Sequence, residues 1–308
     1  MLTYSIIIPH RDIPQLLQRC LESIPQHPDL EIIVVDDNSD PKVVDFACFP
    51  GQERSDTTII LDKTGLGAGH ARNIGLEHAK GKWLLFTDAD DIYVDDMYDI
   101  LNHKKESDAD VIFFKMRSVM SNDLNKPMKR MTYINTYIDD YLMTGDERNI
   151  RLRHPVPWGK MIKRDFVSRN HFHFDETQYT NDNFFAVCVG YYAKKIEAVD
   201  IVLYIYTMRR DSLSGVFCSK PGELAVRTEV SFRIQKMFKE QKIDIDQQRP
   251  FKWYLTELIR KDRALFRYYW ERVDEAYPSK YVAYRVLSKG RTLKFKIKLF
   301  LYSIWVWL

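Results

Sequence analysis

The sequence predicts an α/β protein whose sheet is mostly parallel. Apolar runs rich in β-branched and aromatic residues occupy positions 4–9, 31–37, 83–87 and 110–114, and several of them end in proline or aspartate. Continuous apolar strands of this kind are typical of parallel sheets that are covered on both faces. Residues 14–24, between the first two runs, carry leucine and isoleucine at helical spacing, so the chain begins with a βαβ unit.

Helices are predicted to flank this sheet and to follow it. Residues 69–79 form a helical segment before the third strand. Beyond Pro221, residues 222–242 and 251–269 carry apolar side chains at i, i+3 and i+4 with charges between them, as amphipathic helices do. We therefore expect a C-terminal helical extension.

The domain prediction follows from this change of pattern. Residues 1–215 are expected to form one domain, with a nucleotide-binding half at 1–107 and an acceptor half at 108–215. Residues 216–308 are expected to form a helical region that ends in a basic, aromatic tail at 289–308.

Composition excludes several classes of protein. With 45% apolar and 29% charged residues, the chain is neither disordered nor a polytopic membrane protein. A net charge of +3 does not favour nucleic acid as a partner. The four cysteines form no zinc-binding pattern and are expected to be reduced thiols. No secretion signal follows Met1, so a cytoplasmic location is expected.

Aspartates cluster at the ends of two predicted strands. Asp36 and Asp37 follow the second strand, and Asp88, Asp90 and Asp91 follow the third. Ligands bind at the carboxyl ends of strands in open α/β sheets, and carboxylates crowded there repel one another unless a cation lies among them. Mg²⁺ or Mn²⁺, which prefer carboxylate and phosphate oxygens, would satisfy such a site.

A structural explanation competes with the metal at each cluster. Aspartate and asparagine are also favoured in turns and helix caps, and that explanation suits residues 36–39 about as well. Three aspartates in four residues exceed what one cap requires, although Asp91 is a candidate cap for a helix that follows toward Met97.

Four segments, in this order and spacing, resemble glycosyltransferase family 2. They are 5–9 (Ser-Ile-Ile-Ile-Pro), 33–39 (Ile-Val-Val-Asp-Asp-Asn-Ser), 71–76 (Ala-Arg-Asn-Ile-Gly-Leu) and 79–91, which ends Thr-Asp-Ala-Asp-Asp. The resemblance implies a GT-A fold, an inverting displacement at the anomeric carbon and a nucleotide-sugar donor, with a UDP-sugar favoured. It also implies that Mn²⁺ or Mg²⁺ assists the departure of the nucleoside diphosphate.

The resemblance assigns donor-site roles by position. Asp90 matches the direct metal ligand of the Asp88-Ala89-Asp90 motif, and Asp88 matches the residue that holds ribose or a water-bridged metal. The positions that match the lining of base, ribose and diphosphate are Pro9, His10, Arg11, Asp36, Asp37, Ala89 and Arg72. The family usually carries Pro-x-Tyr-Asn where this chain has Pro-His-Arg-Asp at 9–12.

An inverting transfer also requires a base for the acceptor hydroxyl. Residues 179–185 resemble the Glu-Asp-x-x-Phe motif that carries this carboxylate in the family, which makes Asp182 the candidate. Asn181 stands where the family usually has an acid. The alternative is that Asp182 only caps a helix at 184–192.

Two weaker resemblances concern the acceptor side and the diphosphate. Trp158 lies in a Trp-Gly-Lys stretch like one beside the family's acceptor site, and a buried core aromatic is the alternative. Arg209 and Arg210 resemble a loop that closes over the diphosphate, where guanidinium groups suit phosphate oxygens. An ordinary solvated loop is the alternative there.

The tail at 289–308 combines basic and apolar residues. Its apolar end, 299–308, is about half as long as a membrane-spanning helix requires. Cations beside tryptophan and tyrosine are typical of a helix that lies on an anionic membrane surface, and a helix docked on protein is the alternative. The basic residues are Lys289, Arg291, Lys294, Lys296 and Lys298.

The predicted function is therefore a metal-dependent glycosyltransferase at the inner face of the cell membrane. It would transfer a sugar to a glycan acceptor, favoured to be lipid-linked, in cell-surface polysaccharide synthesis. Two alternatives remain: a metal-dependent nucleotidyltransferase, and a non-catalytic protein that binds membrane or nucleic acid through the tail. The sequence makes no prediction of oligomeric state.

Overall fold

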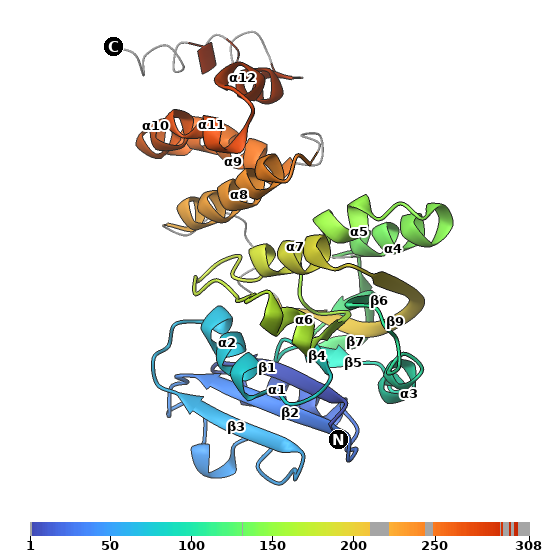
Figure 1. Ribbon diagram of the computed structural model, residues 1–308. Helices are drawn as coiled ribbons and strands as arrows, with labels where there is room; N and C mark the ends of the chain where they lie inside the picture. The colour runs from blue at the N-terminus through green and yellow to red at the C-terminus, as the bar shows by residue number, and fades with distance from the viewer. Residues whose placement is uncertain are drawn as a thin grey trace. The chain divides into compact units, whose positions relative to one another are not determined.

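The computed structural model divides the chain into two compact units, Met1–Val216 and Phe217–Leu308 (Figure 1). The structure describes residues 2–130, 132–209, 222–243 and 249–289, with positions 291, 296, 299 and 300. Each unit is described by itself.

The first unit begins with four parallel strands in the spatial order β3-β2-β1-β4. These strands are β1 (Tyr4–His10), β2 (Leu30–Asp37), β3 (Thr57–Asp62) and β4 (Trp83–Phe86). Helix α1 (Pro14–Glu22) joins β1 to β2, and α2 (Ala68–His78) joins β3 to β4; a short 3-10 helix, Phe46–Cys48, precedes β3. The predicted βαβ start of the chain is confirmed.

Beyond β4 the sheet becomes mixed. Its order continues β4-β8-β6-β9-β5, where β8 (Lys160–Lys163) runs antiparallel to both neighbours and β6 (Val111–Met120) pairs parallel with β9 (Ile196–Met208). The short strand β5 (Ile92–Tyr93) pairs with β9, and β7 (Asp123–Met128) pairs with β6. The mostly parallel part of the sheet therefore lies in the predicted nucleotide-binding half.

Helices cover both faces of this sheet (Figure 1). Ile6 and Ile8 of β1 pack in one apolar cluster with α1 and with α3 (Met97–Asn102), whereas Ile7 packs on the opposite face with α2. That second cluster also includes residues of α4 (Tyr133–Thr144), α5 (Arg148–Arg153), α6 (Arg164–Arg169) and α7 (Asn183–Tyr192). The alternation within β1 explains why its apolar run is continuous.

The second unit is helical, as predicted. It contains α8 (Glu223–Glu240), α9 (Arg249–Lys261), α10 (Arg263–Glu271), α11 (Val273–Ala276) and α12 (Lys280–Ser288), around a core that includes Leu255, Trp270 and Leu287. The prediction of one helix over 251–269 is wrong. The helix stops at Asp262, whose carboxylate accepts a hydrogen bond from Leu265 N at 2.9 Å and caps α10.

Little of the tail lies within the described residues. Leu299 is fully buried in the core of the helical unit, and the Phe300 ring contacts Tyr284 of α12 with 6.4 Å between ring centroids. Lys294, Lys298 and residues 301–308 lie outside the described residues. Among the described helices, none combines the length and the apolar character that crossing a membrane requires.

Candidate active site

The site forms where the parallel strands end. The carboxyl ends of β1, β2 and β4 are neighbours in the sheet, so His10, Asp37 and the turn after Phe86 are brought to one edge. This is the edge at which open α/β sheets bind ligands.

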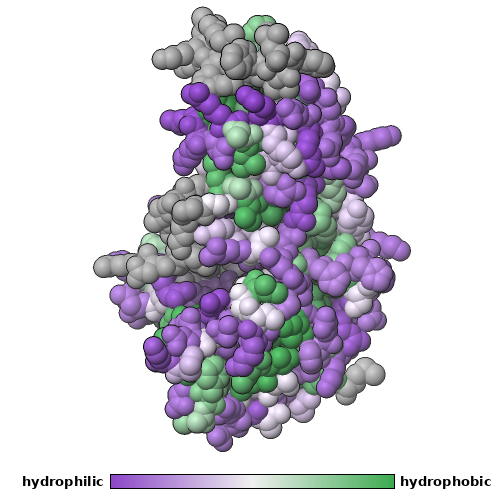
Figure 2. Space-filling model, turned by 90° about the vertical axis from the view of Figure 1, so that its left-hand side faces the viewer, coloured by the Kyte–Doolittle hydropathy of each residue, from purple (hydrophilic) through white to green (hydrophobic). Residues whose placement is uncertain are grey.

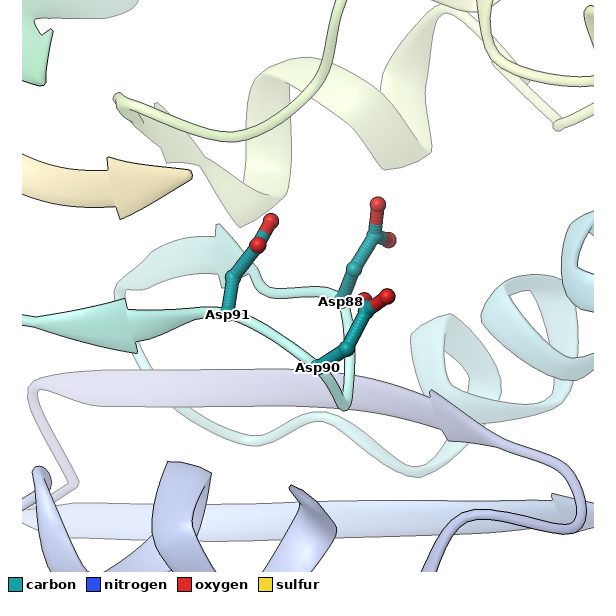
Figure 3. Close-up of side chains that lie close together, drawn as sticks. All are labelled: Asp88, Asp90 and Asp91. Carbon is teal, nitrogen blue, oxygen red and sulfur yellow. The ribbon is translucent and has the colours of Figure 1, made fainter. Parts of the chain in front are cut away.

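Three aspartates gather in the turn between β4 and β5 (Figure 3). Oxygens of Asp88, Asp90 and Asp91 lie within 4.8 Å of one another. The Asp88 and Asp90 side chains are 31% and 18% exposed, so both present oxygens that a divalent cation can reach. Asp88 and Asp90 therefore fit a Mn²⁺ or Mg²⁺ site as predicted.

Asp91 has a structural role instead. It is fully buried, and its carboxylate accepts hydrogen bonds from Tyr204 OH and Thr207 N, both at 2.6 Å. Tyr204 OH also accepts a bond from Asp88 N at 3.1 Å, so β9 holds the acidic turn in shape. The prediction that Asp91 caps the next helix is wrong, because α3 begins at Met97 after Asp96.

Burial and the crowding of carboxylates raise the pKa of Asp90. Burial is the largest cause, the charge of Asp88 adds to it, and Arg209 opposes it. Arg209 Nε donates to Asp90 Oδ2 at 2.9 Å, so this arginine lies at the acidic turn. Arg210 lies outside the described residues.

Arg72 joins the acidic turn to the segment that carries the candidate base. Its Nη2 donates to Asp88 Oδ1 at 2.5 Å and its Nη1 to Asn181 Oδ1 at 2.9 Å. The guanidinium also lies over the Phe174 ring, 5.4 Å from its centroid, and the residue is 4% exposed. Arg72 therefore fixes the geometry between the two segments.

The start of α2 packs tightly against the same segment. A Cβ at Gly69 would lie 2.0 Å from the Asp175 carbonyl oxygen and 3.0 Å from Asn181 Cβ. Only glycine permits this approach, which brings Arg72 within reach of Asn181.

Asp182 is the residue before α7, and its side chain makes no capping hydrogen bond. The residue is partly exposed, and its carboxylate accepts a bond at 3.2 Å from the Asn183 amide, which also donates to Pro155 O at 3.1 Å. Burial raises the pKa of Asp182 to about 6, against the opposing charges of Arg72 and Lys160. A carboxylate with this pKa suits a general base.

His10 and Asp36 form a buried hydrogen-bonded pair. His10 Nδ1 lies 2.8 Å from Asp36 Oδ1, and His10 Nε2 accepts a bond from Ile13 N at 3.3 Å. Ser39 donates to Asp36 through its amide and its hydroxyl. Burial favours a higher pKa for Asp36, but these hydrogen bonds prevail and lower it. Both ring nitrogens of His10 are thus occupied, and its role is to orient Asp36.

The remaining donor-site positions differ in access. Asp37 accepts bonds from Gly67 N at 2.9 Å and from Arg11 Nη1 at 3.3 Å, and the Arg11 side chain is 53% exposed. Pro9 is buried within β1, and Ala89 is 3% exposed within the apolar core. Of these residues, Arg11 is the one most open to a ligand.

Trp158 lies inside the protein. It is 4% exposed and stacks on Tyr204 and Tyr206, with centroids 5.1 and 5.6 Å away. Its ring therefore supports β9, and β9 in turn holds Asp91.

No feature of the sequence alone identifies Tyr204 and Thr207 as the partners of Asp91. They lie more than 110 residues from the acidic turn, and no local motif marks them. Their position on the 13-residue strand β9, beside β5, brings them there.

Comparison with known proteins identifies the family of the chain. The model of glycosyl transferase family 2 matches residues 5–170, more than half of the chain. The glycosyltransferase EpsJ of Bacillus subtilis is 25% identical over 227 residues, covering 69% of this chain and 63% of the relative. A poly(ribitol-phosphate) beta-glucosyltransferase of Bacillus spizizenii is 26% identical over 215 residues, covering 67% and 32%. The match thus spans less than two thirds of either relative.

Solved structures share the fold. S. aureus TarS 1–349 in complex with UDP-GlcNAc aligns with a TM-score of 0.62 at 17% identity, over 98% of this chain and 90% of that one. The mannosyltransferase PcManGT of Pyrobaculum calidifontis, in complex with GDP-Man and Mn²⁺, aligns with a TM-score of 0.52 at 16% identity, over 98% and 82%. The predicted GT-A fold is confirmed, and by the family match the chain belongs to glycosyl transferase family 2.

Proposed function

We propose that the protein is a metal-dependent, inverting glycosyltransferase. It transfers a sugar from a nucleotide-sugar, with a UDP-sugar favoured, to a glycan in cell-surface polysaccharide synthesis. One observation carries the proposal. Arg72 is hydrogen-bonded both to Asp88, which lies beside Asp90, and to Asn181, the residue before Asp182, so the candidate metal ligands and the candidate base belong to one site.

Related proteins support the donor class and the metal. The two aligned structures hold UDP-GlcNAc in one case and GDP-Man with Mn²⁺ in the other. The Bacillus spizizenii relative is named for poly(ribitol-phosphate), an anionic polymer, which supports an anionic glycan as acceptor.

The donor is held by the acidic strand ends. Asp88 and Asp90 would hold Mn²⁺ or Mg²⁺, and Asp37 and Arg11 would lie beside the nucleoside, with Asp36 held behind them by His10 and Ser39. A divalent cation there supplies charge neutralisation for the departing nucleoside diphosphate. Arg209 lies at Asp90 and offers its guanidinium to the same phosphate oxygens.

Asp182 serves as the base. It takes the proton of the acceptor hydroxyl while the oxygen attacks the anomeric carbon opposite the diphosphate, which inverts the configuration. Its side chain is suited to this role because burial raises the pKa of the carboxyl to about 6 and because it is not used as a helix cap.

Charge is segregated between the two units, which supports an anionic partner surface. Residues 217–308 contain 20 Lys and Arg against 10 Asp and Glu, whereas residues 1–216 contain 26 against 33. On the face drawn in Figure 2, hydrophilic residues cover most of the described part of the helical unit. We propose that this unit and the tail hold the enzyme at an anionic membrane surface, where a lipid-linked acceptor is met.

A donor panel tests the enzymatic proposal. Purified protein is incubated with UDP-, GDP-, CDP- and dTDP-sugars, and release of the nucleotide is measured with Mn²⁺ and with EDTA. Asp90→Asn should abolish release, whereas Asp95→Asn, an exposed acid on the same segment, should not. If no nucleotide-sugar is cleaved or raises the melting temperature, the proposal is wrong.

Vesicle sedimentation tests the membrane proposal separately. Truncation after residue 300 removes the apolar end but retains Leu299, which the helical core buries. Full-length protein should bind phosphatidylglycerol vesicles and not phosphatidylcholine vesicles, and binding should be lost in the truncated form. Equal binding by both forms would favour a docked tail.

The other predicted functions are weighed by the same experiments. Family membership favours glycosyl transfer over nucleotidyl transfer. A non-catalytic binding protein would bind vesicles and cleave no donor, and its Asp90→Asn variant would behave like the parent protein.

A further inference from the structure

Lys160 is a fully buried lysine beside the proposed base. It begins β8 directly after Gly159, and it is 1% exposed. Its Nζ donates to His154 O at 3.3 Å and lies over the Phe113 ring, 5.2 Å from the centroid. An ammonium group has three hydrogens to donate, and within the described part of the chain it makes no ion pair within 4 Å.

Such a lysine works against the stability of the fold. An ammonium group taken out of water loses hydration that one carbonyl and one aromatic face do not replace. Burial accordingly lowers the pKa of Lys160 to about 7. An apolar side chain of the same length would suit the position better if packing were its only task.

The carboxylate that acts on Lys160 is that of Asp182. Attraction to Asp182 opposes the effect of burial on the pKa of Lys160, and the charge of Lys160 likewise opposes the raised pKa of Asp182. The other charged groups that act on Asp182 are Arg72 of α2 and Asp88 at the end of β4. Arg72 already donates to Asp88 and Asn181, whereas Lys160 makes no ion pair within 4 Å with any carboxylate of the described residues.

His154 adds to the same arrangement without competing for the carboxylate. It is 1% exposed, and neither ring nitrogen has a hydrogen-bond partner among the described residues. Burial and the neighbouring Lys160 lower its pKa far below the usual value, so the ring stays neutral. The segment from His154 to Lys160 also contains Pro155 O, which the Asn183 amide joins to Asp182 Oδ1.

We propose that Lys160 is a positioning residue for the Asp182 base: a buried cation on the segment that the Asn183 amide joins to Asp182, whose charge favours the ionised form of this carboxylate. This inference rests on the proposed function, in which Asp182 is the base. It assigns a role in the reaction to a residue that need not touch either substrate.

The test compares Lys160→Met with Lys160→Arg and with Lys163→Met, a control at the other end of β8. Release of UDP from UDP-GlcNAc, or from the UDP-sugar that the donor panel selects, is measured from pH 5 to 8 with Mn²⁺. Melting temperature and calorimetric binding of UDP are measured for each variant.

Lys160→Met should move the acidic limb of the pH profile upward by about one unit, which lowers kcat about threefold at pH 6.5 and about ninefold at pH 5. Its melting temperature should be unchanged or higher, because a buried charge is replaced by an apolar chain. UDP affinity should stay within about twofold, and Lys160→Arg should recover part of the rate.

Three results would overturn the inference. They are a wild-type rate and pH profile in Lys160→Met, a parallel loss of melting temperature and UDP binding, and failure of that variant to fold. Asp182→Asn separates the two proposals. If it remains active, the base assignment is wrong; if it is inactive while Lys160→Met behaves as wild type, only the role of Lys160 is wrong.

Discussion

Arg72 and Asp88 form an ion pair with 2.5 Å between Nη2 and Oδ1, and the arginine side chain is only 5% exposed. The second terminal nitrogen of the same guanidinium reaches Asn181, the residue before Asp182. One side chain therefore sets the distance between the proposed metal ligand and the proposed base.

Arg72→Lys should be strongly impaired, because an ammonium group cannot span both partners as the planar guanidinium does. Loss of about 2 kcal/mol of transition-state stabilisation would lower kcat roughly 30-fold. Steady-state donor cleavage measures the effect. Arg148→Lys, at an exposed arginine on α5, is the control, and equal rates in the two variants would contradict this role for Arg72.

The rate should fall on the acidic side of pH 6. A base acts when deprotonated, and burial raises the pKa of Asp182 to about 6, so protonation removes the active form at a higher pH than for an ordinary aspartate. At pH 5 the rate constant should be about one tenth of its plateau. A profile that stays flat down to pH 4.5 would show that another group is the base.

Asp91→Asn should reduce stability and leave the metal site in place. An amide turned toward Tyr204 and Thr207 cannot accept both of their hydrogen bonds, and a buried donor left unpaired costs about 1 to 3 kcal/mol. Denaturant unfolding measures this loss, and Mn²⁺ titration should give an affinity close to that of the parent protein. An unchanged unfolding midpoint with lost Mn²⁺ binding would make Asp91 a metal ligand.

Gly69→Ala should destabilise the protein by steric overlap. The new methyl group would meet the Asp175 carbonyl oxygen at 2.0 Å, and overpacking of this kind costs about 1 to 3 kcal/mol. Gly145→Ala is the comparison without steric overlap: no atom lies within 4 Å of the added Cβ, and any loss of stability there comes from the strain of alanine at a φ of 72°. Donor cleavage should fall in Gly69→Ala alone, because only Gly69 contacts the segment that carries Asn181.

The nucleotide-binding half was predictable because its signals are local. Strands β1, β2 and β4 are buried on both faces, so their apolar runs are continuous and end close to the predicted residues. The edge strand β3 was missed, because its Thr-Thr-Ile-Ile-Leu-Asp sequence is only partly buried and carries no such run. A strand can be predicted from a continuous apolar run only where both of its faces are buried, and β3 does not meet this condition.

Contacts between distant segments could not be predicted. The sequence indicated that His10 and Asp91 are polar residues at strand ends. It did not indicate that His10 is hydrogen-bonded to Asp36, or that the Asp91 carboxylate accepts hydrogen bonds from Tyr204 and Thr207. The end of α9 before Asp262 could have been predicted, since aspartate is a favoured N-cap. It was missed because apolar residues at helical spacing continue on both sides of Asp262.

The paired contacts of Arg72 have a thermodynamic consequence for ligand binding. Asp88 and Asn181 are already immobilised before donor or acceptor arrives. Ordering a side chain at a binding site costs about 0.5 to 1.5 kcal/mol of rotamer entropy per side chain. For Asp88 and Asn181 this cost falls on folding and not on substrate binding. Binding of the two substrates should be favourable in enthalpy with a small entropic penalty from these side chains.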